Sequence, residues 1–150
     1  MLILVAISLG VAFMIPRRYF AADDFSGDWY GYVTNQMGHA LLIGVGATFA
    51  LAEIYQTLVG VHPYRWQLFL AMLAGYSTFE LRQGWRRWDT CEDILFSVVY
   101  GAGGVLWVFR ADSTESHLIA EPDRLTAVLT AMTIHLILGI LRRRQERDLG

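Results

Sequence analysis

The chain has 150 residues, of which 55% are hydrophobic and 17% charged, and its mean hydropathy of +0.38 is high for a soluble domain. An aromatic content of 13% excludes intrinsic disorder, and a single cysteine excludes an internal disulfide framework. The net charge of -2 disfavours nucleic acid as a partner. We therefore expect one membrane domain that comprises residues 1–150.

Five apolar stretches follow one another, at residues 1–15, 37–59, 66–79, 94–109 and 125–141. A hydrocarbon core of about 30 Å requires about 20 helical residues. The third and fourth stretches reach that length only if the helix continues through residues 80–83 and 91–93. A soluble bundle is disfavoured, because the first and last stretches are apolar around most of the helix. The predicted fold class is all-α, an integral membrane helical bundle of about five transmembrane helices.

The first stretch has two interpretations, a cleaved signal peptide and a retained anchor. No basic residue precedes its apolar run, and no small-x-small cleavage pattern follows it. These features favour a retained anchor. The aromatic-rich residues 19–32 are expected at the membrane interface.

The arginines predict the orientation of the chain, because basic residues near span ends stay in the cytoplasm. Nine would lie on one side: Arg17, Arg18, Arg82, Arg86, Arg87, Arg142, Arg143, Arg144 and Arg147. Three would lie on the other: Arg65, Arg110 and Arg124. The expected location is the bacterial inner membrane, with the N-terminus outside and the C-terminus in the cytoplasm.

Ionisable residues inside the apolar stretches are costly, and they usually face the interior of a bundle. They are His39, Glu53, Glu80, Asp93 and His135. His39, Gly46 and Glu53 are spaced by seven residues, which predicts one inward face of a regular helix. At about 1.5 Å of rise per residue, His39, Glu80 and Asp93 share one level, whereas Glu53 lies about 21 Å from His39. His135 is expected to close the site from above.

The connector between the third and fourth stretches concentrates polar side chains. These are Glu80, Arg82, Gln83, Arg86, Arg87, Asp89, Thr90, Glu92 and Asp93. Glu80 and Gln83 fall on one helix face, and Arg87 is spaced to fold back on Asp93. Three small residues follow, Ser97, Gly101 and Gly104, and their spacing favours the close approach of another helix.

The stretch FELRQGWRRWDTCEDILFSVVYGAGG resembles the signature of the VanZ-like membrane proteins, and Asp89-Thr90-x-x-Asp93 is similar to a motif of the YjdF-like proteins. The matching residues are Glu80, Gln83, Arg87, Asp93 and Gly104, with Gly38, His39, Gly44 and Glu53 upstream. Ser97 and Tyr100 depart from the VanZ-like pattern, which has asparagine and glycine there. The resemblance covers about residues 35–108. It implies a small polytopic bacterial membrane protein, some relatives of which are associated with glycopeptide resistance, and it brings no settled reaction.

Two functions are compatible with this polar site. The first is an enzyme or binding protein that acts on a lipid or lipid-linked headgroup, with Glu80 and Asp93 as acid and base and His39 as a proton relay. The ligand-binding candidates are Arg82, Gln83, Arg86, Arg87 and Asp89, the arginines holding phosphate. The second is a non-catalytic accessory subunit or a small pore-forming protein, in which Glu80 and Asp93 form an ion-pair clamp with Arg87 or Arg82 and His39 is a buried histidine hydrogen-bonded to a carboxylate.

The sequence assigns no cofactor and no metal ligands. His39, Glu80, Asp89 and Asp93 offer donors suited to zinc, manganese or magnesium, but they lack a dedicated metal-ligand spacing. The expected partners are membrane lipids, a lipid-linked substrate, and a protein partner or a second copy of the chain.

Overall fold

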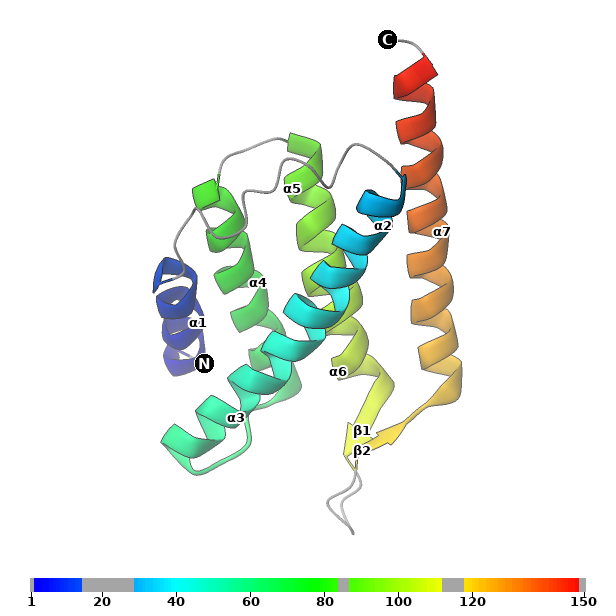
Figure 1. Cartoon of the computed structure of the whole chain (residues 1–150). Coiled ribbons are helices and arrows are strands. Elements are labelled where there is room, and N and C mark those ends of the chain that lie inside the picture. Colours follow the sequence, from blue (N-terminus) through cyan, green and yellow to red (C-terminus); the bar gives the residue numbers. More distant parts are fainter. Residues whose placement is uncertain (1, 15–28, 84–86, 112–117, 149–150) are drawn as a thin grey trace.

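A computed structural model describes residues 2–14, 29–83, 87–111 and 118–148, and these residues form five helical rods and one short hairpin (Figure 1). The rods are α1 (Leu2–Met14); α2 (Trp29–Gly38), η2 (His39–Gly46) and α3 (Ala47–Val59); α4 (Arg65–Gln83); α5 (Arg87–Ile94), η3 (Leu95–Gly103) and α6 (Gly104–Val108); and α7 (Pro122–Asp148). The hairpin pairs β1 (Phe109–Ala111) with β2 (Leu118–Ala120) in antiparallel register. The rods alternate in direction along the chain (Figure 1).

Three of the rods are long and apolar enough to cross a membrane: Trp29–Val59, Asp89–Val108 and Pro122–Gln145. Many large apolar side chains on the rods point outward, and only 11% of the apolar window of α7 is buried in the bundle. This surface suits lipid contact rather than water. The helical bundle is therefore consistent with a membrane protein. The 13 residues of α1 measure about 20 Å, less than a hydrocarbon core, so the count of five spans stays a prediction.

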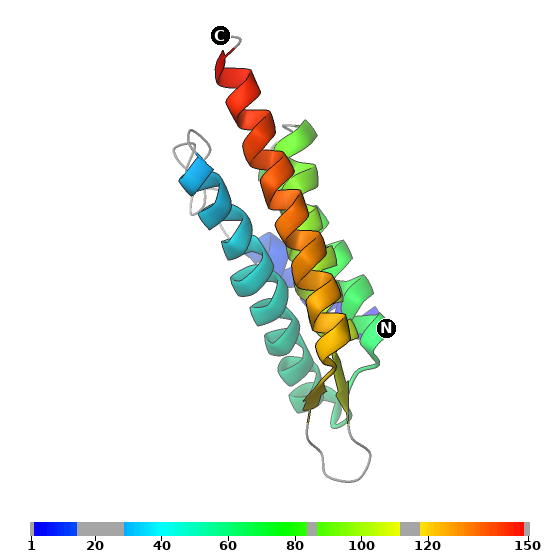
Figure 2. The same cartoon turned by 90° about the vertical axis from the view of Figure 1, so that its right-hand side faces the viewer.

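The predicted helical extensions are confirmed, because α4 continues to Gln83 and the next described helix begins at Arg87. The second rod begins at Trp29, eight residues earlier than expected. Consequently Tyr32, expected at the membrane interface, is almost fully buried in the bundle. Figure 2 shows α7 running along the other rods, with the hairpin at the end opposite the C-terminus.

A tight seam joins η2 to η3. A Cβ atom built on Gly44 would lie 2.6 Å from the Cα of Gly101, and one built on Gly101 would clash with the carbonyl of Ala40. Gly104 makes a further close approach, to Val128 of α7. The prediction that Gly101 and Gly104 admit neighbouring helices is confirmed.

The predicted inward face of the second rod is wrong. Gly46 and Glu53 are exposed, and the buried line instead runs through Ala40, Gly44 and Thr48. The reason lies in η2, where π-helical i→i+5 hydrogen bonding widens the turn, so that seven residues no longer make two turns. The prediction that Glu53 stays outside the polar cluster is confirmed.

The short helix α1 packs on α4. Ser8 Oγ donates to the carbonyl of Ala71 at 2.6 Å, and Gly75 lies directly beneath Ser8, where no side chain would fit. Arg82 then donates to the carbonyl of Ala12 at 2.5 Å, near the end of α1. Leu4 is completely buried in the core that these helices share with α3 and η3.

Candidate functional site

Three titratable side chains from three rods meet near one end of the bundle. His39 of η2, Glu80 of α4 and Asp93 of α5 each offer one ligand atom, and these atoms all lie within 4.8 Å of one another. His39 Nε2 lies 3.5 Å from Asp93 Oδ1. The expectation that the three residues share one level is confirmed. We call them the triad.

Polar neighbours hold the histidine ring. His39 Nδ1 lies 2.6 Å from Tyr76 Oη and 3.4 Å from Ser97 Oγ, and both hydroxyl groups belong to buried residues. Tyr76 stands four residues before Glu80 on α4, so the two occupy the same helix face. Tyr76 is not among the residues predicted from the sequence, although its spacing of four residues from Glu80 already indicates a shared helix face.

Gln36 fixes the aspartate. Its Nε2 donates to Asp93 Oδ1 at 3.1 Å, and Gln36 precedes His39 by one helical turn. The Gln36 side chain is only 2% exposed, and its Oε1 has no hydrogen-bond partner among the described residues. One amide oxygen is thus left without a donor next to the triad.

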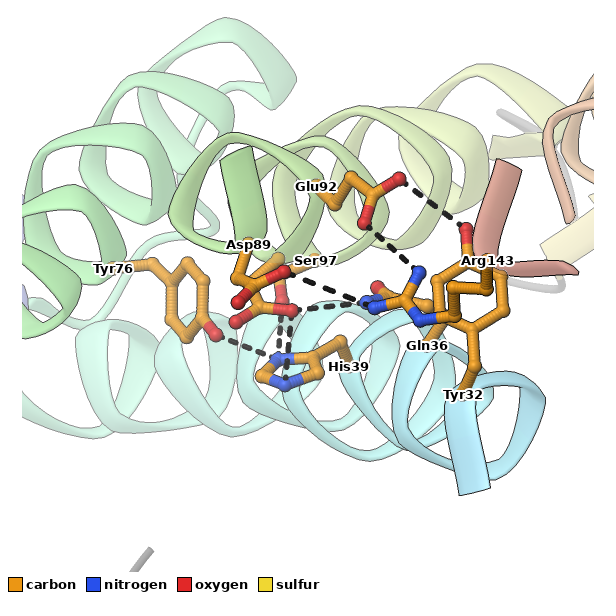
Figure 3. A network of polar contacts seen from close by, with 9 residues as sticks. Tyr32, Gln36, His39, Tyr76, Asp89, Glu92, Ser97 and Arg143 are labelled. Carbon is orange, nitrogen blue, oxygen red and sulfur yellow. Dashed lines mark hydrogen bonds and ion pairs between the residues drawn. The ribbon is translucent and has the colours of Figure 1, made fainter. Parts of the chain in front are cut away.

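A second group of contacts surrounds Arg143 of α7 (Figure 3). Its guanidinium lies 3.8 Å from Asp89 Oδ1, 3.7 Å from Glu92 Oε2 and 3.9 Å from the centre of the Tyr32 ring. Tyr32 donates a long hydrogen bond of 3.4 Å to Glu92 Oε1, and His135 Nε2 lies 3.9 Å from the same oxygen. We call this group the Arg143 cluster. It ties the last helix to α2 and α5.

The remaining predicted site residues are less central or lie outside the description. Arg82 is directed to α1, where it also stacks at 4.6 Å from the ring of Phe13. Arg86 and the side chains of Gln83 and Arg87 fall outside the described residues. Asp89 belongs to the Arg143 cluster rather than to the triad. His135 also joins that cluster, through Glu92, so its predicted role in closing the triad stays a prediction.

The charges of these two groups do not balance. The carboxylates are Glu80, Asp89, Glu92 and Asp93, and the permanently positive partner among the described contacts is Arg143. Carboxylates that are withdrawn from water need a proton, a cation or several hydrogen bonds to remain in place. Glu80 and Asp93 therefore each depend on a proton, on a cation or on hydrogen bonds such as the one that Gln36 donates to Asp93.

An apolar groove of about 130 Å³ begins where the polar contacts end. Its lining comes from η2, from η3 and α6, and from α7, and it includes Ala40, Gly101 and Met132. Each of these three residues lies within about one turn of a polar residue on the same rod, respectively His39, Ser97 and His135. Tyr100 joins the two regions, because its ring lines the groove and lies 6.0 Å from the ring of His135.

The fold and the site together define a helical-bundle protein with three candidate membrane-spanning helices and a buried polar network near one end. No family model, curated protein or solved structure significantly matches the chain. The resemblance to VanZ-like and YjdF-like proteins therefore stays a prediction.

Proposed function

We propose that this is an integral protein of the bacterial inner membrane that binds the headgroup of a lipid or lipid-linked molecule at the triad and part of an acyl chain in the apolar groove. The observation that carries the proposal is the order of the triad and the apolar groove along the bundle. The two follow one another on the second and fourth rods, where His39 is followed by Ala40 and Asp93 by Gly101, and a lipid has the same succession of polar and apolar parts.

The size of the groove limits what it accommodates. At about 130 Å³ it is smaller than the roughly 300–1,000 Å³ of a typical drug-sized ligand pocket. It thus suits part of one chain, while the rest of the lipid would lie against the outer surface of α7. The lining is almost entirely aliphatic or aromatic, so an apolar chain loses no hydrogen bonds there.

The chemistry of the triad constrains the headgroup. The excess of carboxylates favours an amine headgroup, or a phosphate that arrives with a cation. Arg82 is engaged by α1 and Arg143 by Asp89 and Glu92, so neither is free to hold phosphate without breaking those contacts. If the headgroup is also processed, Glu80 and Asp93 would exchange protons with it, and His39 would relay them toward Tyr76.

The orientation proposed from the arginines places this site at the cytoplasmic side. The end of α4, the start of α5 and the C-terminal part of α7 lie at the end of the bundle opposite the hairpin (Figure 1). Glu80 stands three residues before the end of α4, and Asp93 six residues after the start of α5. The headgroup would then come from the inner leaflet.

The second candidate is a non-catalytic accessory subunit. The Arg143 cluster favours it, because ion pairs of this kind would hold α7 on the bundle without any ligand. A pore is supported less, since its polar side chains should continue through the depth of the membrane. Glu53, the acidic residue toward the other end of the second rod, is exposed on the outside of the bundle.

Native mass spectrometry of protein extracted gently in its own lipids tests the proposal. We expect a specific lipid to remain on the wild type and on Glu53→Gln, and to be lost from Asp93→Asn, which keeps the size of the side chain but not its charge. Filling the groove with Leu129→Trp should also displace the lipid, whereas Leu138→Trp, on the outer face of α7, should not. Equal lipid retention by all variants, or none by the wild type, would favour the accessory subunit.

A further inference from the structure

We propose that the triad is a binding site for one divalent transition-metal ion of the Zn²⁺ or Mn²⁺ type, held by His39 Nε2 and by one carboxylate oxygen each of Glu80 and Asp93. The inference deepens the proposed function and rests on it for what the metal would do in the cell. Binding of the metal itself requires no lipid.

The spacing of the donor atoms fits such an ion. Two metal–ligand bonds of about 2.1 Å that meet at about 90–110° place their donor atoms about 3.0–3.4 Å apart. His39 Nε2 and Asp93 Oδ1 are 3.5 Å apart, and one oxygen of Glu80 lies within 4.8 Å of a ring nitrogen of His39 and of a carboxylate oxygen of Asp93. Small side-chain rotations of Glu80 would close the remaining distance.

The donor set also selects the kind of metal. Imidazole nitrogen suits zinc and other transition metals, and carboxylate oxygen extends the range to manganese. Three protein ligands leave at least one coordination position open, which is typical of sites that exchange water or substrate rather than of closed structural sites. An open position next to the groove is where a headgroup oxygen would reach the metal.

Neighbouring residues orient the ligands as they do in known metal sites. A metal-bound histidine usually bonds through its other ring nitrogen to a polar group, and a metal-bound carboxylate usually accepts a hydrogen bond. His39 Nδ1 has this partner in Tyr76 at 2.6 Å, and Asp93 has it in Gln36 at 3.1 Å. Both contacts leave His39 Nε2 directed toward Asp93.

Two further observations point to a cation with bound water. Gln36 Oε1 is buried without a hydrogen-bond partner among the described residues, while the Nε2 of the same amide donates to Asp93, and it would accept a hydrogen bond from a water on the metal. Two described arginines are directed elsewhere, since Arg82 binds α1 and the ion pairs of Arg143 are with Asp89 and Glu92. A divalent ion would compensate both carboxylates of the triad.

The test uses the full chain, purified in detergent, stripped with a chelator and then titrated with Zn²⁺. We expect about one tightly bound zinc per chain by elemental mass spectrometry. Affinity, measured by competition with a chromophoric chelator, should fall at least tenfold in His39→Gln, Glu80→Gln and Asp93→Asn. Asp89→Asn is the matched control, because Asp89 contacts Arg143 instead, and its affinity should stay within about twofold of the wild type.

A second measurement leaves the triad unchanged, in case those variants do not fold. Cys91 is exposed, is the only cysteine of the chain and precedes Asp93 by two residues, so it accepts a nitroxide label. Stoichiometric Mn²⁺ should broaden the spectrum of this label strongly. A label placed instead by Val61→Cys in a Cys91→Ser background, at the far end of the bundle, should be affected little.

The proposal is overturned if the wild type binds no zinc stoichiometrically, if Asp89→Asn loses as much affinity as Asp93→Asn, or if Mn²⁺ leaves the label at Cys91 unbroadened or broadens both labels equally. The two proposals fail separately. Zinc binding without lipid retention would refute only the lipid site, and lipid retention by a chain that binds no metal would refute only the metal site.

Discussion

Replacing Gly44 with alanine should destabilise the bundle and disturb the triad together. The new Cβ would lie 2.6 Å from the Cα of Gly101, about 0.8 Å inside ordinary van der Waals contact at 3.4 Å, and nearer still to the carbonyl of Ser97. Both obstacles are backbone atoms, so no side-chain rotation relieves them and the rods must separate. Overpacking of this kind typically costs about 1–3 kcal/mol, and we expect the upper half of that range.

Separation of these rods should also pull His39 away from Asp93, because Gly44 lies little more than one turn from His39, and Ser97, whose carbonyl the new Cβ would meet, lies about one turn from Asp93. A displacement of about 0.8 Å is large against the roughly 0.2 Å tolerance of metal–ligand bonds, so zinc affinity should fall at least tenfold. Unfolding in mixed detergent and SDS micelles, followed by circular dichroism, measures the first effect, and chelator competition measures the second.

The matched control is Gly46→Ala on the same helix. Its Cβ would meet only a carbonyl of its own rod, at 3.7 Å, so this variant should keep or slightly improve stability through better helix propensity. A second check is the double variant Gly44→Ala/Gly101→Ala, whose cost should be less than the sum of the single costs, because both side chains demand the same separation. The reasoning is refuted if Gly44→Ala is as stable as Gly46→Ala and keeps the wild-type zinc affinity.

Two further changes test how the outer helices are attached. Arg143→Gln should lower the free energy of unfolding by about 3 kcal/mol, because it removes the guanidinium that faces the carboxylate of Glu92. This value is at the low end for breaking a buried ion pair, since the contact is long. The control Arg144→Gln changes an exposed neighbour and should cost less than about 0.5 kcal/mol. The same unfolding assay measures both, and equal effects would contradict the importance of the pair. Gly75→Ala should displace the Ser8 side chain, detach α1 from α4 and so speed proteolysis near the N-terminus. Gly10→Ala is the control, because a Cβ atom at Gly10 would meet no other atom within 4 Å, and it should leave the cleavage rate unchanged.

Depth along the helices was the part of the site that the sequence could predict. Rise per residue is nearly constant, so counting from the span ends was sufficient to bring His39, Glu80 and Asp93 to one level. The small residues Gly101 and Gly104 likewise predicted close contacts between helices, because glycine is otherwise unfavourable within a helix. Both inferences need only local geometry.

The lateral arrangement of the helices was not predictable in the same way. The sequence analysis uses Arg143 only to predict the orientation of the chain, because nothing in a single sequence says which helix α7 would touch. The exposed position of Gly46 was missed for a different reason, since the π-helical turn of η2 is a tertiary adjustment without a sequence signal. Gln36 and Tyr76 did have a signal, one helical turn before His39 and Glu80, respectively.

The triad and the Arg143 cluster differ in which groups face their carboxylates. This difference distinguishes a ligand-binding site from an ion-pair clamp that holds helices together. In the Arg143 cluster the carboxylate of Glu92 faces a guanidinium, which is the arrangement that holding α7 in place requires. In the triad, Glu80 and Asp93 face a histidine whose other nitrogen is already occupied by a tyrosine hydroxyl. A clamp would gain by placing an arginine there as well, and the chain has arginines close by. The triad instead holds three potential donor atoms within 4.8 Å of one another, which is the arrangement that the proposed metal ion would use.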